Sequence, residues 1–158
     1  MIEASGSAIG EYNIEGFFTP EGRFFIVEIN PRQAGHYNPQ DIQDYCGVNL
    51  TRLLITTAVG DLSYYEELKH FQRAHNNILS YSVFSFKDGV PDHIHIDDNL
   101  SSGIIHYRYL HGQKEGDRVQ EIVSAIRPIA KIVFQFETEN ELESIREKIP
   151  ELVYAVLK

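Results

Sequence analysis

Three oxygen-bearing side chains, Glu15, Glu28 and Asn30, have the spacing to meet on one small patch of a β-hairpin. A turn centred on Glu21 and Gly22 would place Glu15 directly opposite Glu28 on the neighbouring strand. Glu28 and Asn30 lie two positions apart, so their side chains project from the same face. Like charges directly opposite each other destabilise a sheet, and a cation bound between them would remove that cost. Oxygen ligands without His or Cys are typical of a Mg²⁺ or Mn²⁺ site that also takes phosphate oxygens.

A second interpretation of the same residues is an exposed, solvated sheet face, because a shift of one residue in register would turn the two glutamates apart. Arg32 favours the metal site. It follows Asn30 by two positions, after a proline, where its guanidinium could reach a phosphate or carboxylate beside the metal. These residues together predict a site for phosphate chemistry.

The same residues form a pattern known from one enzyme family. Glu15, together with the run EINPRQAG at residues 28–35, closely resembles the C-terminal metal-binding motif of the ATP-grasp superfamily. The stretch 41–61 is similar to the helix pair that closes this domain in biotin-carboxylase-like and L-amino-acid-ligase-like members. The resemblance covers about residues 1–61, and the combination of Glu-x-Asn-Pro-Arg with a correctly spaced upstream glutamate makes it specific.

The resemblance implies a role for each residue. Glu15 would be the first metal ligand, Glu28 the carboxylate that bridges two Mg²⁺ (or Mn²⁺) ions, and Asn30 the third ligand. Arg32 would contact the transferred phosphate or the acyl substrate, so Glu28, Asn30 and Arg32 would hold the phosphates of ATP. In the implied reaction, a substrate carboxylate attacks the γ-phosphate and an amine (or a thiol) captures the acyl-phosphate. Metal ions and the arginine would neutralise charge on the transferred group.

Segments that a complete ATP-grasp enzyme places before this motif have no counterpart in the sequence. Those segments supply lysines, a glycine-rich loop and the hinge that contacts adenine, whereas the first lysine here is Lys69. We therefore expect a C-terminal fragment of a carboxylate-amine ligase that is inactive alone, with its carboxylate and amine substrates bound through the missing domains. An alternative from another class is a non-catalytic binding or interaction module that keeps the fold without nucleotide.

The hairpin strands are expected within residues 11–18 and 23–30, which are rich in aromatic and β-branched side chains. Helical patterns follow at about 39–45, 50–59 and 62–75. The first has Asn38 as its expected N-cap with a proline after it, and the second has Asn49 as its expected N-cap. These helices would flank the hairpin.

Strand patterns dominate the chain after residue 78. An Asp-Gly turn at 88–89 predicts a second hairpin between residues 78–86 and 91–97, because that dipeptide is a strong hairpin signal. A strand at 103–110, a helical or extended stretch at 118–127, a strand at 130–136 and a strand at 152–157 complete the expected order. Thr138 and Glu141 form a capping box that predicts the start of a helix before the last strand.

These elements predict an α+β fold, in which an antiparallel sheet with flanking helices forms the C-terminal half of an ATP-grasp domain and a small C-terminal α/β segment follows. We expect two parts, residues 1–76 with the metal-binding hairpin and residues 77–158 as a lid or packing element. The second part contains no motif that we can tie to chemistry. Its expected role as a lid or packing element is inferred by analogy with related ligases.

Composition excludes several classes of protein. The 158 residues carry a formal net charge of -9, which disfavours a nucleic-acid partner. No apolar run is long enough to span a membrane. The one cysteine, Cys46, excludes a disulfide framework and favours a cytoplasmic location, where we expect it to be a structural thiol. A homodimer remains an open alternative to a monomer.

A second group of residues has the spacing of a possible transition-metal site. His93, His95 and Asp97 alternate along the sequence and would face one way on a strand, as transition-metal ligands can. An exposed polar face, with Ile94 and Ile96 turned to the core, fits the same alternation. The sequence favours this second interpretation.

Overall fold

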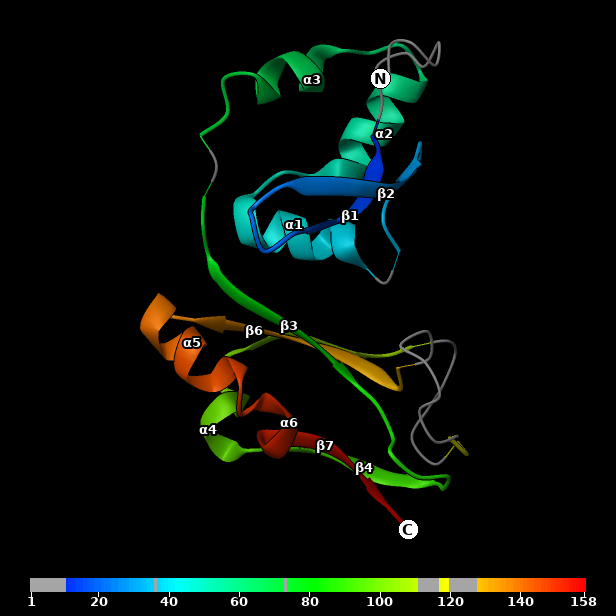
Figure 1. Cartoon of the computed structure of the whole chain (residues 1–158), viewed down its shortest axis with the longest axis vertical. Helices are drawn as coiled ribbons and strands as arrows, with labels where there is room; N and C mark the ends of the chain where they lie inside the picture. The colour runs from blue at the N-terminus through cyan, green and yellow to red at the C-terminus, as the bar shows by residue number, and fades with distance from the viewer. Residues whose placement is uncertain (1–10, 36, 73, 111–116, 120–127) are drawn as a thin grey trace. The chain divides into compact units, whose positions relative to one another are not determined.

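The computed structural model describes residues 11–35, 37–72, 74–110, 117–119 and 128–158. The chain divides into two compact units, residues 1–75 and 76–158. In Figure 1, unit 1 contains β1 (Asn13–Phe18), β2 (Phe24–Asn30), α1 (Asn38–Cys46), α2 (Leu50–Ala58) and α3 (Ser63–Leu68). Unit 2 contains β3 (Asn77–Val83), β4 (Pro91–Ile96), α4 (Asp98–Ser101), β5 (Ile104–Tyr109), β6 (Ala130–Phe136), α5 (Glu139–Arg146), α6 (Ile149–Leu152) and β7 (Val153–Leu157).

Strands β1 and β2 form the predicted antiparallel hairpin, and its register contains a bulge. Glu15 lies opposite Glu28, but the next pair is Gly16 with Ile26, so Val27 has no partner across the ladder. A Cβ atom at position 16 would overlap the carbonyl oxygen and the ring of neighbouring β2 residues, which is why a glycine occupies this close approach. The turn is therefore centred on Glu21, half a residue earlier than expected, and the bulge restores the predicted pairing of the glutamates.

Helices α1 and α2 follow the hairpin as predicted, with one difference at the first cap. Tyr37, in the left-handed region with φ of 63°, occupies the N-cap position of α1, so the prediction of Asn38 as the cap is wrong. Asn49 caps α2 as predicted, because its side chain accepts a hydrogen bond from the Arg52 amide at 2.7 Å. Cys46 is buried, and its thiol donates to the carbonyl oxygen of Ile42 at 3.1 Å, in agreement with a structural thiol.

The third helix is much shorter than predicted. It ends at Leu68 rather than near residue 75, and the bonds after it run from Lys69 and His70 to carbonyls three residues back. The next residue, Phe71, extends its ring over Gly47, where an added Cβ would come within 3.2 Å of it. Phe71 thus packs against the residue that ends α1, a tertiary contact that local periodicity does not encode.

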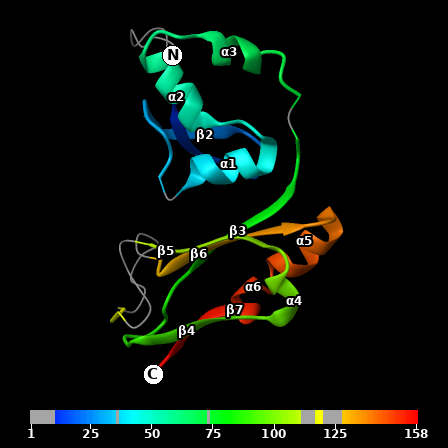
Figure 2. The ribbon, with the colours of Figure 1, turned by 180° about the vertical axis from the view of Figure 1, so that it is seen from behind.

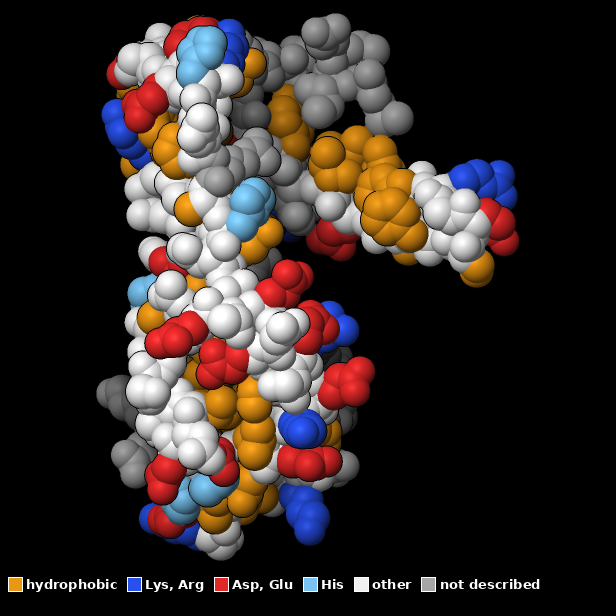
Figure 3. Space-filling view, turned by 90° about the vertical axis from the view of Figure 1, so that its left-hand side faces the viewer, with side chains coloured by type: hydrophobic (Ala, Val, Ile, Leu, Met, Phe, Trp, Pro, Cys, Tyr) orange, Lys and Arg blue, Asp and Glu red, His pale blue; other side chains and the backbone are white. Residues whose placement is uncertain are grey.

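Unit 1 buries few hydrophobic side chains. In its described part these are Cys46, Val48 and Tyr64. The turn end of the hairpin instead exposes apolar side chains on both faces, which form the orange group on the projecting arm in Figure 3. Two ring pairs cross the strands, Phe17 with Phe25 at 5.7 Å and Phe18 with Phe24 at 4.9 Å between centroids. The exposed residues of this end are Phe17, Phe18, Phe24, Phe25, Ile26 and Val27.

The strands of unit 2 do not pair as the sequence suggested. β6 lies between β3 and β5 in a three-stranded antiparallel sheet, and β4 pairs with β7 in a second, two-stranded sheet. The predicted hairpin between 78–86 and 91–97 is therefore wrong. The loop that carries the Asp-Gly pair connects the two sheets, and Gly89 forms an isolated bridge with Val119. Most of the stretch predicted at 118–127 lies outside the described residues.

The core of unit 2 lies between its two sheets and the adjoining helices, whose order can be followed in Figure 2. β6 is buried on both faces, and Ile132 and Phe134 are fully enclosed. The prediction that Thr138 starts α5 is confirmed, since its hydroxyl accepts from the Glu141 amide at 3.2 Å. The buried cluster consists of Val83, Leu100, Ala130, Ile132, Phe134, Phe136, Ile149 and Val153.

The α+β class with antiparallel pairing and flanking helices is confirmed. The described strands form three small sheets, with helices covering parts of them. Among the residues that the structure describes, no helix is long and apolar enough to cross a membrane.

Candidate metal and phosphate site

The hairpin brings three of the predicted site residues onto one face. Glu15 and Glu28 form one rung of the ladder, and Asn13 and Asn30 form the rung two residues further from the turn. Side chains alternate along a strand, so these four share a face, whereas Ile14 and Ile29 of the rung between them lie on the other. The face therefore presents two carboxylates and two carboxamides at its open end.

The two carboxylates differ in their surroundings. Asn13 Nδ2 donates a hydrogen bond of 3.1 Å to Glu15 Oε1. Glu28 is exposed, and no described cation forms an ion pair with either glutamate. Two negative charges thus lie opposite each other, and no side chain in the described ranges compensates them, an arrangement that disfavours the ladder unless a cation binds.

Asn30, the last residue of β2, has a side-chain amide nitrogen that forms no hydrogen bond to the described residues. Its Nδ2 atom is buried and has no hydrogen-bond partner in the structure. Glu11 Oε2 and Gln33 Nε2 are also buried and form no hydrogen bond of standard geometry in the described part of the chain. Burial raises the pKa of Glu11, and the side chain of Gln33 opposes this rise in part. Unsatisfied buried polar atoms are rare in proteins, and these three belong to residues at or just beyond the ends of β1 and β2.

Sequence reasoning missed Glu11 and Gln33. The available signal for Glu11 was the strand alternation, since Glu11, Asn13 and Glu15 are spaced by two. Gln33 has no comparable signal, because it lies in the irregular segment after β2.

Arg32 is exposed and turns toward its own neighbour. Its Nη1 atom donates to the carbonyl oxygen of Gln33 at 2.9 Å, and its backbone amide donates to the Asn30 carbonyl at 2.9 Å. Within the described part of the chain, Arg32 makes no ion pair with Glu15 or Glu28. The guanidinium is held by one neutral hydrogen bond at the surface, so reorientation toward an anion would cost little.

The alternating histidines of β4 have local partners. His93 Nδ1 lies 3.2 Å from Asp92 Oδ2, and the ring of His95 lies 4.8 Å from that of Tyr154 on β7. Asp97 is the N-cap of α4, where its carboxylate accepts from the Asn99 amide at 3.0 Å. In the described ranges, no group of three or more His, Cys, Asp or Glu side chains is arranged to hold a metal ion.

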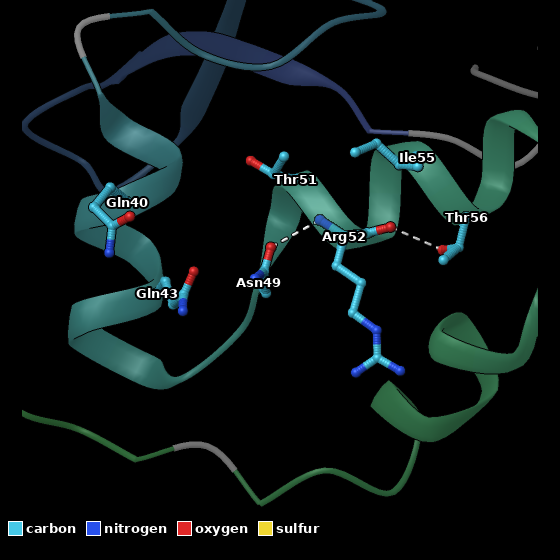
Figure 4. A pocket seen from close by; sticks show the side chains of 7 residues that line it. All are labelled: Gln40, Gln43, Asn49, Thr51, Arg52, Ile55 and Thr56. Atoms are coloured by element: carbon cyan, nitrogen blue, oxygen red, sulfur yellow. Dashed lines mark hydrogen bonds between the residues drawn. The ribbon is translucent and has the colours of Figure 1, made fainter.

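A second polar surface lies in unit 1, where an open cleft of about 470 Å³ borders α1 and the start of α2 (Figure 4). Its one cation, Arg52, already lies 4.1 Å from the centroid of the Tyr64 ring and 3.8 Å from a Glu67 oxygen. Amide and hydroxyl groups form most of the remaining wall. The cleft is lined by Gln40, Gln43, Asn49, Thr51, Arg52, Ile55 and Thr56.

Comparison with solved structures shows what this fold is similar to. Phosphoribosylglycinamide synthetase from Anaerococcus prevotii matches with a TM-score of 0.74 at 15% identity, over 99% of this chain and 39% of that one. L-amino acid ligase from Bacillus licheniformis matches with a TM-score of 0.77 at 14% identity, over 99% of this chain and 40% of that one. No protein-family model matches the sequence, and no curated protein matches it.

The fold is therefore that of a part of two larger ligases. The chain spans about two fifths of the length of either structure. At 14% and 15% identity the likeness establishes the fold alone. The expected architecture is confirmed, and one of the two structures carries the name of a ligase group that the hairpin motif resembles.

Proposed function

We propose that this chain is the C-terminal part of an ATP- and Mg²⁺-dependent ligase of the ATP-grasp type. Such an enzyme forms an acyl-phosphate from a carboxylate, with release of ADP, and an amine then captures the acyl group with release of phosphate. The observation that carries the proposal is the rung of Glu15 opposite Glu28, with Asn30 on the same face. The fold shared with two ligases supports it.

The donor set of this face fits a hard divalent cation. Glu15, Glu28 and Asn30 offer carboxylate and carboxamide oxygens, and the described part of the site supplies no sulfur or imidazole ligand. Mg²⁺ usually keeps several waters and binds through one or two carboxylates and the phosphates of a nucleotide. Bound Mg²⁺ would neutralise charge on the transferred phosphoryl group. The repulsion between the two glutamates would thus be removed only when Mg²⁺ is bound.

Arg32 is the proposed catalytic contact to the phosphate or the acyl group. Its guanidinium is exposed and bonded only to the neutral Gln33 carbonyl among the contacts given above. A charge-assisted, bidentate bond to a phosphate is stronger than that neutral bond. Arg32 would therefore exchange its carbonyl partner for the anion when the nucleotide binds.

The proposal assigns the remaining parts of the reaction to protein outside this chain. Groups that would hold adenine and the acid and amine substrates are expected in the part of a longer ligase that this chain does not span. Residues 77–158 would pack against the catalytic part or form a lid. A cytoplasmic location fits a free, buried cysteine.

The first test is Mn²⁺ binding to the 158-residue chain, followed by electron paramagnetic resonance of the free ion. We expect binding by the wild type and a loss of affinity of about tenfold or more in Glu28→Gln, because one of the proposed carboxylate ligands is lost. Glu21→Gln, at the tip of the same hairpin, is the matched control and should bind as the wild type does.

Two outcomes would overturn parts of the proposal. A wild-type chain that binds no Mn²⁺ with or without ATP, or a Glu28→Gln chain that binds as well as wild type, would favour a non-catalytic interaction module. Steady release of ADP by the chain alone, with amino acids as candidate substrates, would instead refute its dependence on further segments.

A further inference from the structure

Asn13 is the one described side chain that forms a hydrogen bond to a proposed metal ligand. Its Nδ2 atom donates to Glu15 Oε1 at 3.1 Å, along the strand and on the shared face. Asn13 also lies directly opposite Asn30 in the ladder. It is therefore adjacent to the site along β1 and across to β2, although the motif itself assigns it no role.

The bond restricts the Glu15 carboxylate without occupying it. A carboxylate has two oxygens and about four lone-pair positions, so a single donor at Oε1 leaves Oε2 available to a metal ion. Glu15 is exposed on a two-stranded hairpin, where little else limits its side-chain rotamers. Outer partners of this kind orient metal ligands and preserve their geometry before the metal arrives.

The chemical type of Asn13 suits this task. A lysine or arginine at the same position would also bond Glu15, but its charge would repel an incoming divalent cation at short range. An amide donates without adding positive charge. It therefore holds the ligand while the negative potential of the rung is preserved.

We propose that Asn13 is a positioning residue for the metal site, which holds the Glu15 carboxylate on the face it shares with Glu28 through the Nδ2–Oε1 hydrogen bond. The proposal rests on the metal site of the proposed function. Asn13 acts through Glu15 and need not contact the metal or the nucleotide.

The test compares Mn²⁺ affinities of Asn13→Leu and Asn13→Gln in the 158-residue chain, measured from the free-ion resonance signal. Leucine has nearly the shape of asparagine but no donor, and we expect its dissociation constant to rise about tenfold. Glutamine keeps the amide and should recover most of the affinity. Asn99→Leu is the control, because Asn99 Nδ2 donates in the same way to an acid two residues away, Asp97, at 2.9 Å in unit 2.

A double substitution separates positioning from other roles. In a Glu15→Gln chain, Asn13→Leu should change the remaining affinity by less than about twofold, since the group through which Asn13 acts is already altered. An equal loss in both backgrounds would overturn the proposal, because Asn13 would then act on the metal directly or on the fold. Hydrogen exchange at the Glu15–Glu28 rung reports the fold, and loss of affinity together with loss of exchange protection would likewise count against positioning.

The failure of this inference can be told from the failure of the proposed function. If the wild type binds no Mn²⁺, the metal site itself is refuted. If the wild type binds, Glu28→Gln weakens binding and Asn13→Leu does not, only the role of Asn13 is refuted.

Discussion

Replacement of Glu28 by glutamine should stabilise the hairpin while it weakens the response to magnesium. Glu28 lies directly opposite Glu15, and no described cation compensates the pair. The neutral side chain removes the repulsion and keeps nearly the same shape. If Glu28 serves metal binding at the expense of stability, its replacement should raise the stability of the hairpin and lower its affinity for magnesium.

The size of the effect follows from the ladder. Opposed side chains in an antiparallel pair have Cβ atoms about 5 Å apart, and two unit charges at that distance in water repel by about 0.8 kcal/mol. At 0.15 M salt, where the screening length is about 8 Å, this falls to about 0.4 kcal/mol. Amides of the ladder should therefore exchange with solvent about fourfold more slowly in Glu28→Gln at low salt and about twofold more slowly at 0.15 M.

The assay is hydrogen exchange at residues 13–15 and 28–30, first in EDTA and then in saturating Mg²⁺. The wild-type ladder should gain protection with Mg²⁺, and the variant should gain less and need at least about tenfold more Mg²⁺ to do so. Glu21→Gln, which leaves the rung intact, should behave as the wild type does. Faster exchange in Glu28→Gln in EDTA, or an equal gain with Mg²⁺ in both proteins, would show that the charges do not meet at a metal site.

Three further predictions concern the units that carry the site. Phe134→Ala should destabilise unit 2 by about 3–5 kcal/mol in chemical denaturation, because the ring is 0% exposed and its removal leaves a cavity; a cost below 1 kcal/mol would contradict this core. Asn49→Ala should cost about 1 kcal/mol in exchange protection of α2, since Asn49 caps the helix through the 2.7 Å bond to the Arg52 amide. Burial raises the pKa of Glu11 in the folded protein above its value in the unfolded chain. The protonated carboxyl therefore contributes its full stability below the unfolded-state pKa, and this contribution is lost as the pH rises through the folded-state pKa. Glu11→Gln should therefore flatten the fall in unit 1 stability as the pH rises above 4.5, the ordinary pKa of a glutamate, in thermal unfolding. An unchanged fall would exclude Glu11 as its source.

The site residues that could be predicted from sequence are those governed by short-range rules. Strand composition and the alternation of side chains place Glu28 and Asn30 on one face, and the structure does so. The pairing of Glu15 with Glu28 was predicted from a turn centred on Glu21 and Gly22, and it forms because the bulge at Val27 offsets the earlier turn. The orientation of Arg32 toward the Gln33 carbonyl and the burial of Glu11 could not be predicted in this way. Both depend on how the chain packs after β2, which no local pattern records.

Strand pairing in unit 2 shows the same limit more clearly. The Asp-Gly dipeptide is a strong local turn signal, yet β3 pairs with β6, about fifty residues away, and β4 pairs with β7. Long-range pairs are decided by which apolar faces can be buried together. In this arrangement Ile132 and Phe134 on one face of β6 and Val133 on the other are buried, and the energy of that burial exceeds what a two-residue turn can contribute.

The register of the rung of Glu15 and Glu28 depends on the bulge rather than on the turn. Near the turn, Phe17 pairs with Phe25, and continuation of that register would set Glu15 opposite Val27 and move Glu28 to the other face. The extra residue, Val27, restores the opposition of the two glutamates, and Gly16 permits the close approach of the strands beside it. Bulges of this kind bend a strand and re-aim its side chains near functional sites. The pairing of two like charges is thus maintained by a local irregularity that works against the regular ladder, which argues that the opposition of Glu15 and Glu28 serves binding rather than stability.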